Sequence, residues 1–178
     1  LIESLRIRET GSDSEVLELV LNEESIRFPS VHHLASKMNW TDKETGELLE
    51  TLKKQKKALS LNDGSFFHKK FWDRVTEKTT ELLTAFHKEN PIASGMEKEE
   101  VKSRLLESFY LTDPKKGDVL LNELLKRGVI TAAGSAVALA GFSAQYSDAH
   151  SDMRETILQA YLKAGVEAPA TDDVMAQF

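Results

Sequence analysis

Hydrophobic residues recur at intervals of three and four along most of the chain, which predicts a largely helical protein. In the first part of the sequence this spacing predicts three helices, and two short alternating stretches after them predict strands joined by a tight turn. The predicted helices cover residues 13–22, 30–38 and 42–57, and the strands cover residues 58–61 and 65–68. Three helices followed by a hairpin are the plan of a winged helix-turn-helix domain.

The same order of elements occurs a second time and begins a third time. The second copy has predicted helices over residues 69–89, 97–109 and 113–127 and strands over residues 129–131 and 137–139. The third copy has one helix, residues 148–163, and the start of another, residues 172–178. We therefore predict a mostly α fold with small β-hairpins, of the α+β class, built as tandem winged helix-turn-helix domains. The predicted domains are residues 1–72, residues 73–146 and a truncated third domain over residues 147–178.

The helix over residues 69–89 is expected to join the first two domains rigidly. Neither Gly nor Pro interrupts it, so it leaves the first hairpin and continues as the first helix of the second domain. Trp72 is expected to pack toward the first domain, and Leu83 and Phe86 into the second. In the preceding strand, alternation predicts that one of Phe66 and Phe67 faces the core and the other is exposed.

The amino-acid composition limits the cellular compartments and the kinds of binding partner that fit this protein. The 178 residues contain no cysteine, which excludes disulfides and thiolate metal sites and fits the cytoplasm. The formal net charge of −6 means that any nucleic-acid contact has to be local. No apolar run reaches the ~20 residues of a membrane span, so we expect no membrane contact, and we expect a monomer. The chain begins at Leu1 without Met and ends within a predicted helix, so we expect a piece of a longer protein.

No motif in the chain predicts catalysis. The glycines form neither a phosphate loop nor a dinucleotide fingerprint, and the five histidines lack ligand spacing and are expected on helix surfaces or in the hairpins. We therefore expect no catalytic, cofactor or metal site. The best functional candidates are RNA-contacting lysines where the third helix meets the first hairpin: Lys53, Lys54, Lys56 and Lys57. Lysines at a helix end also compensate the helix dipole, which explains them more simply.

One segment contains a specific residue motif in addition to the general order of helices and strands. It has His, two variable residues, Asn-Pro, a short loop, Gly-Met and Lys-Glu-Glu, at positions His87, Asn90, Pro91, Gly95, Met96, Lys98, Glu99 and Glu100. This pattern resembles the second winged-helix domain of the bacterial selenocysteine-specific elongation factors, the SelB family. Mild departures occur at Ile92, Ala93, Glu97, Val101 and Lys102, and they remove one expected positive charge. The stretch from Ala164 to Pro169 is similar to the family's next domain.

The resemblance implies a large translation factor. A part that binds GTP, magnesium and selenocysteyl-tRNA would precede this chain, and a module that binds the messenger RNA hairpin would follow it. The chain itself would be a non-catalytic spacer that contacts RNA or the ribosome. Two other classes stay open: a tandem winged-helix DNA-binding transcriptional regulator and a protein-interaction scaffold. The acidic charge, and the lack of Arg on the third helices before their ends, disfavour the regulator.

Overall fold

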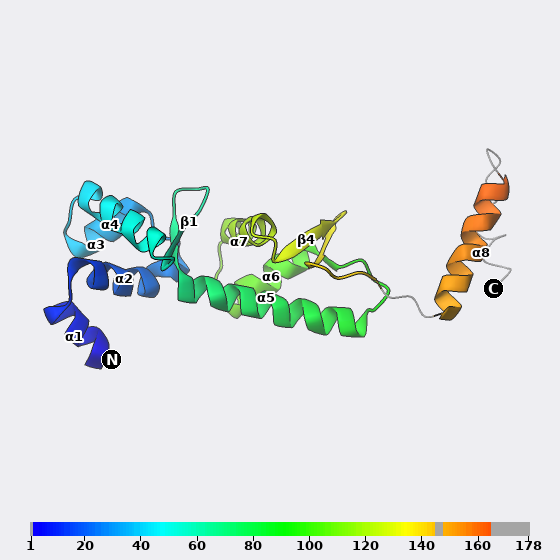
Figure 1. Ribbon diagram of the computed structural model, residues 1–178, viewed down its shortest axis with the longest axis horizontal. Coiled ribbons are helices and arrows are strands. Elements are labelled where there is room, and N and C mark those ends of the chain that lie inside the picture. Colours follow the sequence, from blue (N-terminus) through cyan, green and yellow to red (C-terminus); the bar gives the residue numbers. More distant parts are fainter. Residues whose placement is uncertain (1, 145–147, 165–178) are drawn as a thin grey trace.

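The computed structural model describes residues 2–144 and 148–164, which form two winged-helix modules and one further helix (Figure 1). The first module contains α1 (Ile2–Thr10), α2 (Asp13–Glu24), the short 3₁₀ helix η1 (Ser25–Arg27), α3 (Val31–Met38), α4 (Asp42–Lys54), β1 (Ala58–Ser60) and β2 (Phe66–His68). The second contains α5 (Lys69–Glu89), β3 (Met96–Glu97), α6 (Lys98–Ser108), α7 (Pro114–Lys126), β4 (Ile130–Ala133) and β5 (Ala136–Leu139), and α8 (Asp148–Ala164) follows. The prediction of a mostly α protein with small hairpins is confirmed.

Two elements were absent from the sequence prediction, for different reasons. The apolar residues of α1 do not gather on one face, so no helical pattern marks it. The strand β3 has only two residues, too few for alternation to be recognised. It pairs antiparallel with β5, Met96 opposite Val137, and makes a three-stranded sheet in the order β3-β5-β4. In the first module a single bridge between Ser30 and Ser65 takes the corresponding place beside the β1–β2 hairpin.

Side-chain caps fix where several helices begin. The Thr41 hydroxyl accepts from the Glu44 backbone N–H at 3.2 Å, and the Glu44 carboxylate accepts from the Thr41 N–H at 3.1 Å. This reciprocal pair is a capping box, and it satisfies two backbone donors that the first turn of α4 leaves free. Asp113 likewise accepts from the Lys115 N–H at 3.0 Å and starts α7.

The first module has a core of its own between its helices and its hairpin. Leucines from α2, α3 and α4 meet one face of the hairpin there, and all are fully or almost fully buried. Its buried members are Leu17, Val20, Leu21, Leu34, Leu49, Leu52, Ala58 and Phe66. Because Phe66 lies in this core, β2 serves as one wall of the first module.

A second core belongs to both modules. It takes Leu61 and Phe67 from the first hairpin, Phe71, Trp72, Val75 and Leu83 from α5, and Met96, Val101, Leu105, Phe109, Leu120, Leu121, Leu124, Ile130 and Val137 from the second module. We call it the shared core. The prediction that one of Phe66 and Phe67 is exposed is wrong, because β2 lies between two cores and buries both rings.

The helix α5 is continuous from Lys69 to Glu89, as predicted, and Figure 1 shows it running from the first hairpin beneath the second module. Its buried side chains all join the shared core or lie beside it, and Trp72 is therefore packed against both modules instead of the first alone. Because α5 contributes to both modules, the boundary between residues 72 and 73 stays a prediction.

The predicted first helix of the third copy corresponds to α8. The predicted start of its second helix, residues 172–178, lies outside the described residues. No helix in the described part of the chain is both long and apolar enough to cross a lipid bilayer.

The shared core predicts that the two modules unfold together. Phe67→Ala removes a fully buried ring and is expected to lower the free energy of unfolding by about 3–5 kcal/mol, while Ile92→Ala, at a half-exposed position, changes it by less than about 0.5 kcal/mol. In urea titrations of single-tryptophan variants, W72F retains Trp40 and reports on the first core, and W40F retains Trp72 and reports on the shared core. Two separate midpoints in the otherwise unchanged protein would show that the modules are independent.

Candidate nucleic-acid interface

A row of aromatic rings crosses from the first module to the second. Phe28 meets Phe67 edge-on with ring centroids 4.7 Å apart, and Phe67 lies 4.9 Å from Phe71. Phe71 in turn lies 5.3 Å from Phe109, at the end of α6. Such pairs add about 0.5–1.5 kcal/mol each to the burial of their surface, so the row fixes the angle between the modules.

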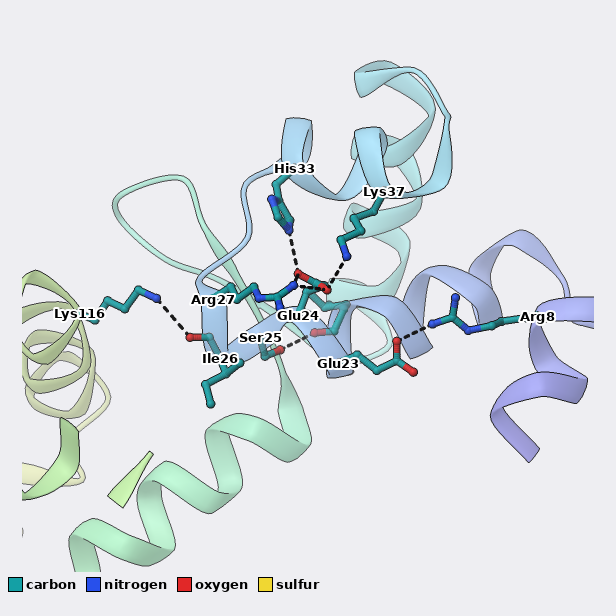
Figure 2. Close-up of polar contacts among 10 residues, drawn as sticks. Arg8, Glu23, Glu24, Ser25, Ile26, Arg27, His33, Lys37 and Lys116 are labelled. Carbon is teal, nitrogen blue, oxygen red and sulfur yellow. Dashed lines mark hydrogen bonds and ion pairs between the residues drawn. The ribbon is translucent and has the colours of Figure 1, made fainter. Parts of the chain in front are cut away.

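Basic side chains of α7 secure the same joint from outside. Lys116 donates to the Ile26 carbonyl at 3.4 Å, a contact shown in Figure 2, and its ammonium lies 5.1 Å from the centre of the Phe28 ring. Lys126 donates to the Asn62 side-chain oxygen at 2.8 Å. The Arg127 guanidinium lies 5.3 Å from the centre of the Trp72 ring. The second module thus contacts the first module at both η1 and the turn of the first hairpin.

Glu24 organises the polar side of the first module at this joint (Figure 2). Only 7% of the residue is exposed, and its carboxylate accepts from His33 at 2.8 Å and Arg27 at 2.9 Å and pairs with Lys37 at 3.2 Å. Burial alone raises the pKa of Glu24, but the hydrogen bonds from these three side chains outweigh it and lower the pKa to about 2. The carboxylate therefore ties α3 to η1.

A cleft of about 600 Å³ opens where the two modules meet. The end of α4, the strand β1, the start of α5 and the end of α7 all contribute to its wall. Its lining residues are Lys53, Lys56, Ala58, Leu59, Ser60, Lys69, Trp72, Asp73, Thr76, Arg127 and Val129. We call this the intermodule cleft, and four of its side chains are cationic against one carboxylate.

Three of the four cations already have acidic partners. Lys53 pairs with Glu50 at 2.7 Å, Lys69 with Asp73 at 2.7 Å, and Arg127 with Glu123 at 2.7 Å. The side-chain ammonium of the fourth, Lys56, has no acceptor within hydrogen-bond distance among the described residues. The backbone of Lys56 has the left-handed φ of 60°. Thr76 is also part of the wall of the cleft. Its hydroxyl oxygen is buried and has no hydrogen-bond partner among the described residues.

The structure separates the four predicted RNA-contact lysines. Lys53 and Lys56 line the intermodule cleft, and Lys54 is exposed beside them. Lys57 points elsewhere: it pairs with Glu18 at 2.6 Å and lines a smaller hollow of about 230 Å³ together with His68 and Lys70. The four predicted lysines therefore lie on two different surfaces. Only the surface with Lys53 and Lys56 faces the second module.

Lys69 and Arg127 complete the cleft, and the sequence analysis did not select them. The position of Lys69 follows from the register of the first hairpin, in which Ala58 lies opposite His68. This register places Lys69 beside Lys57, and the Lys69 N–H donates to the Lys57 carbonyl at 2.8 Å. Arg127 directly follows the third helix of its module, as Gln55 does in the first. Only the folded joint shows that these two helix ends face each other.

The helices that would read a DNA groove do not offer a basic face. The exposed residues of α4 include four carboxylates, Asp42, Glu44, Glu47 and Glu50, against Lys43 and Lys54. The helix borders an open groove of about 410 Å³ together with Trp40. On α7, Lys116 is held by the first module and Lys102 of the neighbouring α6 binds Asp118 at 2.7 Å. Carboxylates on a reading helix repel phosphates, which leaves the intermodule cleft as the candidate nucleic-acid surface.

Two histidines are buried: His87 was expected on a helix surface, which corrects the prediction, while His68 lies in the hairpin as expected. The ring Nδ1 of His68 caps α5 by accepting from the Lys70 N–H at 3.1 Å, and the backbone N–H of His68 donates to the Ser25 hydroxyl at 2.8 Å. His87 stacks on Phe142 with ring centroids 3.5 Å apart, and its Nε2 accepts from the Leu139 N–H at 3.3 Å. Burial lowers the pKa of both rings, so each is a neutral structural acceptor.

The motif that carries the family resemblance holds the second hairpin against α5. His87 binds β5, and Asn90 ends α5 with its N–H and side-chain amide both donating to the Phe86 carbonyl. Gly95 is required by space, because a Cβ there would lie 2.3 Å from the Val137 carbonyl oxygen. Met96 follows in the shared core. These residues are thus structural, and none of them lines the intermodule cleft.

Helix order, hairpins and third strand together define a winged-helix protein with two modules joined through one core. Residues 80–139, most of the second module, match the family model of elongation factor SelB, winged helix, for the second such domain. The match confirms the predicted resemblance to the SelB winged-helix family for this segment. No curated protein matches the chain.

The Glu24 cluster predicts a pH-dependent contribution to stability. The pKa of Glu24 lies below its ordinary value of 4.5, at about 2, so its contribution is complete above pH 4.5 and is lost as the pH falls toward 2. We expect Glu24→Gln to lower the free energy of unfolding at pH 7 by about 2 kcal/mol, allowing for its partly exposed partners. The difference from wild type should shrink below pH 4.5. Glu23→Gln, which breaks an exposed pair with Arg8, is the control and should cost less than about 0.5 kcal/mol.

Proposed function

We propose that this chain is the rigid spacer region of a selenocysteine-specific elongation factor. It joins a GTPase part that delivers selenocysteyl-tRNA to a module that binds the messenger RNA hairpin. The observation that carries the proposal is the shared core, which makes two modules one body, in a chain whose residues 80–139 match the SelB winged-helix family. A spacer of this kind sets the distance between codon and hairpin.

Two properties of the joint support rigidity over a flexible tether. The 21 residues of α5 form one helix, which spans roughly 30 Å at 1.5 Å per residue. The junction between β2 and α5 contains no linker, because His68 is at once the last residue of β2 and the residue that caps α5. Flexible tethers are usually rich in Gly and Ser, and this junction has neither.

In this proposal the chain itself is not an enzyme. GTP and magnesium bind to the GTPase part of the whole factor, and the cytoplasm is the compartment in which the factor acts. Its RNA partners are the messenger hairpin, reached through a following module, and selenocysteyl-tRNA, reached through the GTPase part. The ribosome is the further partner that the spacer itself would contact.

A DNA-binding transcriptional regulator is the competing proposal, and the charges on the reading helices argue against it. A regulator would place the exposed face of α4 or α7 in the major groove. The α4 face carries four carboxylates, and two of the three lysines of α7, Lys116 and Lys126, are engaged at the joint. A protein-interaction scaffold fits the acidic groove on α4, but the SelB family match favours the translation factor.

The spacer proposal predicts that loosening the joint lowers selenocysteine insertion by the whole factor. Phe28→Asn removes the ring that contacts Phe67 and Phe71 and lies beside the Lys116 ammonium of the second module, at a cost of about 1–3 kcal/mol. Asn tolerates the left-handed φ of 61° at this position. Readthrough of a selenocysteine reporter should fall, while GTP hydrolysis and binding of the messenger hairpin stay unchanged.

Tyr110→Asn provides the matched control. Tyr110 also has a left-handed φ, of 53°, but it is 94% exposed. The control should retain wild-type readthrough. NMR relaxation on the chain should give one rotational correlation time for both modules in the wild type and in Tyr110→Asn, and two in Phe28→Asn. Wild-type readthrough by Phe28→Asn, with the modules shown to be uncoupled, contradicts the spacer proposal.

A further inference from the structure

The geometry points to the intermodule cleft as a binding site for the phosphodiester backbone of an RNA strand. This inference rests on the proposed function for its choice of RNA, since the protein is assigned there to an RNA-dependent factor. The site itself rests on the joint: the first hairpin and its flanking helices bring Lys53, Lys56 and Lys69 together, and the second module adds Arg127 and Val129. A single winged-helix module does not contain it.

Each cation of the cleft is available to a phosphate for a physical reason. Lys56 has no protein acceptor among the described residues, so a phosphate gains its charge without breaking a contact. The pairs of Lys53 with Glu50 and Lys69 with Asp73 are partly exposed, and such pairs contribute about 0–1 kcal/mol. Exchanging those carboxylates for a phosphate therefore costs little.

Arg127 is held in place, which suits an anchor. Its Nε donates to Glu123, a carboxylate that is only 3% exposed, and its guanidinium carbon lies over the Trp72 ring. A guanidinium fixed through Nε keeps its remaining N–H groups for an external acceptor, and phosphate oxygens fit that fork. The flexible lysines then surround one oriented donor.

The surroundings of the cleft favour a chain of phosphates over a single anion. Lys54 is exposed next to Lys53, and Lys126 is exposed next to Arg127, so the basic surface continues past both helix ends. The cleft offers no open aromatic face for base stacking, because Trp72 is 8% exposed and covered by Arg127. Binding should therefore depend on phosphates and salt and be independent of base sequence.

The test is the affinity of the 178-residue chain for a fluorescein-labelled 12-nucleotide oligouridine, measured by anisotropy across a salt series. The variant K53Q/K56N/K69Q removes three cleft charges, and Asn suits the left-handed backbone of residue 56. The control K43Q/K78Q/K88Q removes three exposed lysine charges from elsewhere, so both proteins have the same net charge. Circular dichroism and melting temperature show that both variants are folded.

We expect the cleft variant to lose about tenfold or more in affinity at low salt and to reduce the slope of log K against log salt by about 2, at roughly 0.7 per phosphate contact. The control should bind like wild type. Equal loss in both variants, or no binding by wild type at low salt, overturns the site. Tighter binding to a 12-nucleotide DNA, or displacement of RNA by an equal concentration of heptaglutamate, overturns the assignment to RNA.

These results are separable from the spacer proposal. Phe28→Asn tests the rigidity of the joint through readthrough, and the lysine substitutions leave the aromatic row intact. If the cleft variant loses RNA binding while Phe28→Asn keeps normal readthrough, only the cleft proposal is supported. If the cleft variant keeps RNA binding while Phe28→Asn loses readthrough, only the spacer proposal is supported.

Discussion

The molecule depends on a short strand that is buried on both sides. A strand normally presents one face to a core and the other to water, and β2 instead places Phe66 in the core of the first module and Phe67 in the shared core. Because the backbone of β2 passes directly into α5, the two cores cannot shift relative to one another without exposing one of these rings. The angle between the modules, the position of α7 and the walls of the intermodule cleft all follow from that double burial.

Polar contacts refine this arrangement but do not create it. The pairs at the rim of the joint, such as Lys126 with Asn62, involve exposed side chains and contribute little each. Glu24 is different, since its carboxylate is nearly buried and has three basic partners around it. It stabilises η1, the segment from which Phe28 projects into the aromatic row. The electrostatic cluster and the hydrophobic joint are therefore connected through one turn of 3₁₀ helix.

Much of the fold was predictable because its signals are local. The helix caps at Thr41 and Asp113, the turn at Asp63-Gly64 and the uninterrupted helix over residues 69–89 each depend on residues adjacent in the sequence. The burial of Phe66 beside Phe67 was not predictable, since it depends on what covers the outer face of the hairpin. The same limit applies to the candidate site: Lys53 and Lys56 stand out as a basic run, whereas Arg127 becomes their neighbour only through the joint. His68 and His87 lack any sequence sign of burial for the same reason.

The shared core also sets an order for events during synthesis of the chain. The first module can close around its own leucines once β2 has been made, because its core uses no residue beyond Phe66. Phe67 and Phe71 then have to wait for α6 and α7, some of whose buried residues lie about 50 positions further along. During that interval, several seconds at a synthesis rate of roughly 5–20 residues per second, the nascent protein carries an uncovered aromatic strip next to a strand edge. A chaperone that binds aromatic segments would find its target there, and the target would vanish when Leu120 and Leu124 arrive.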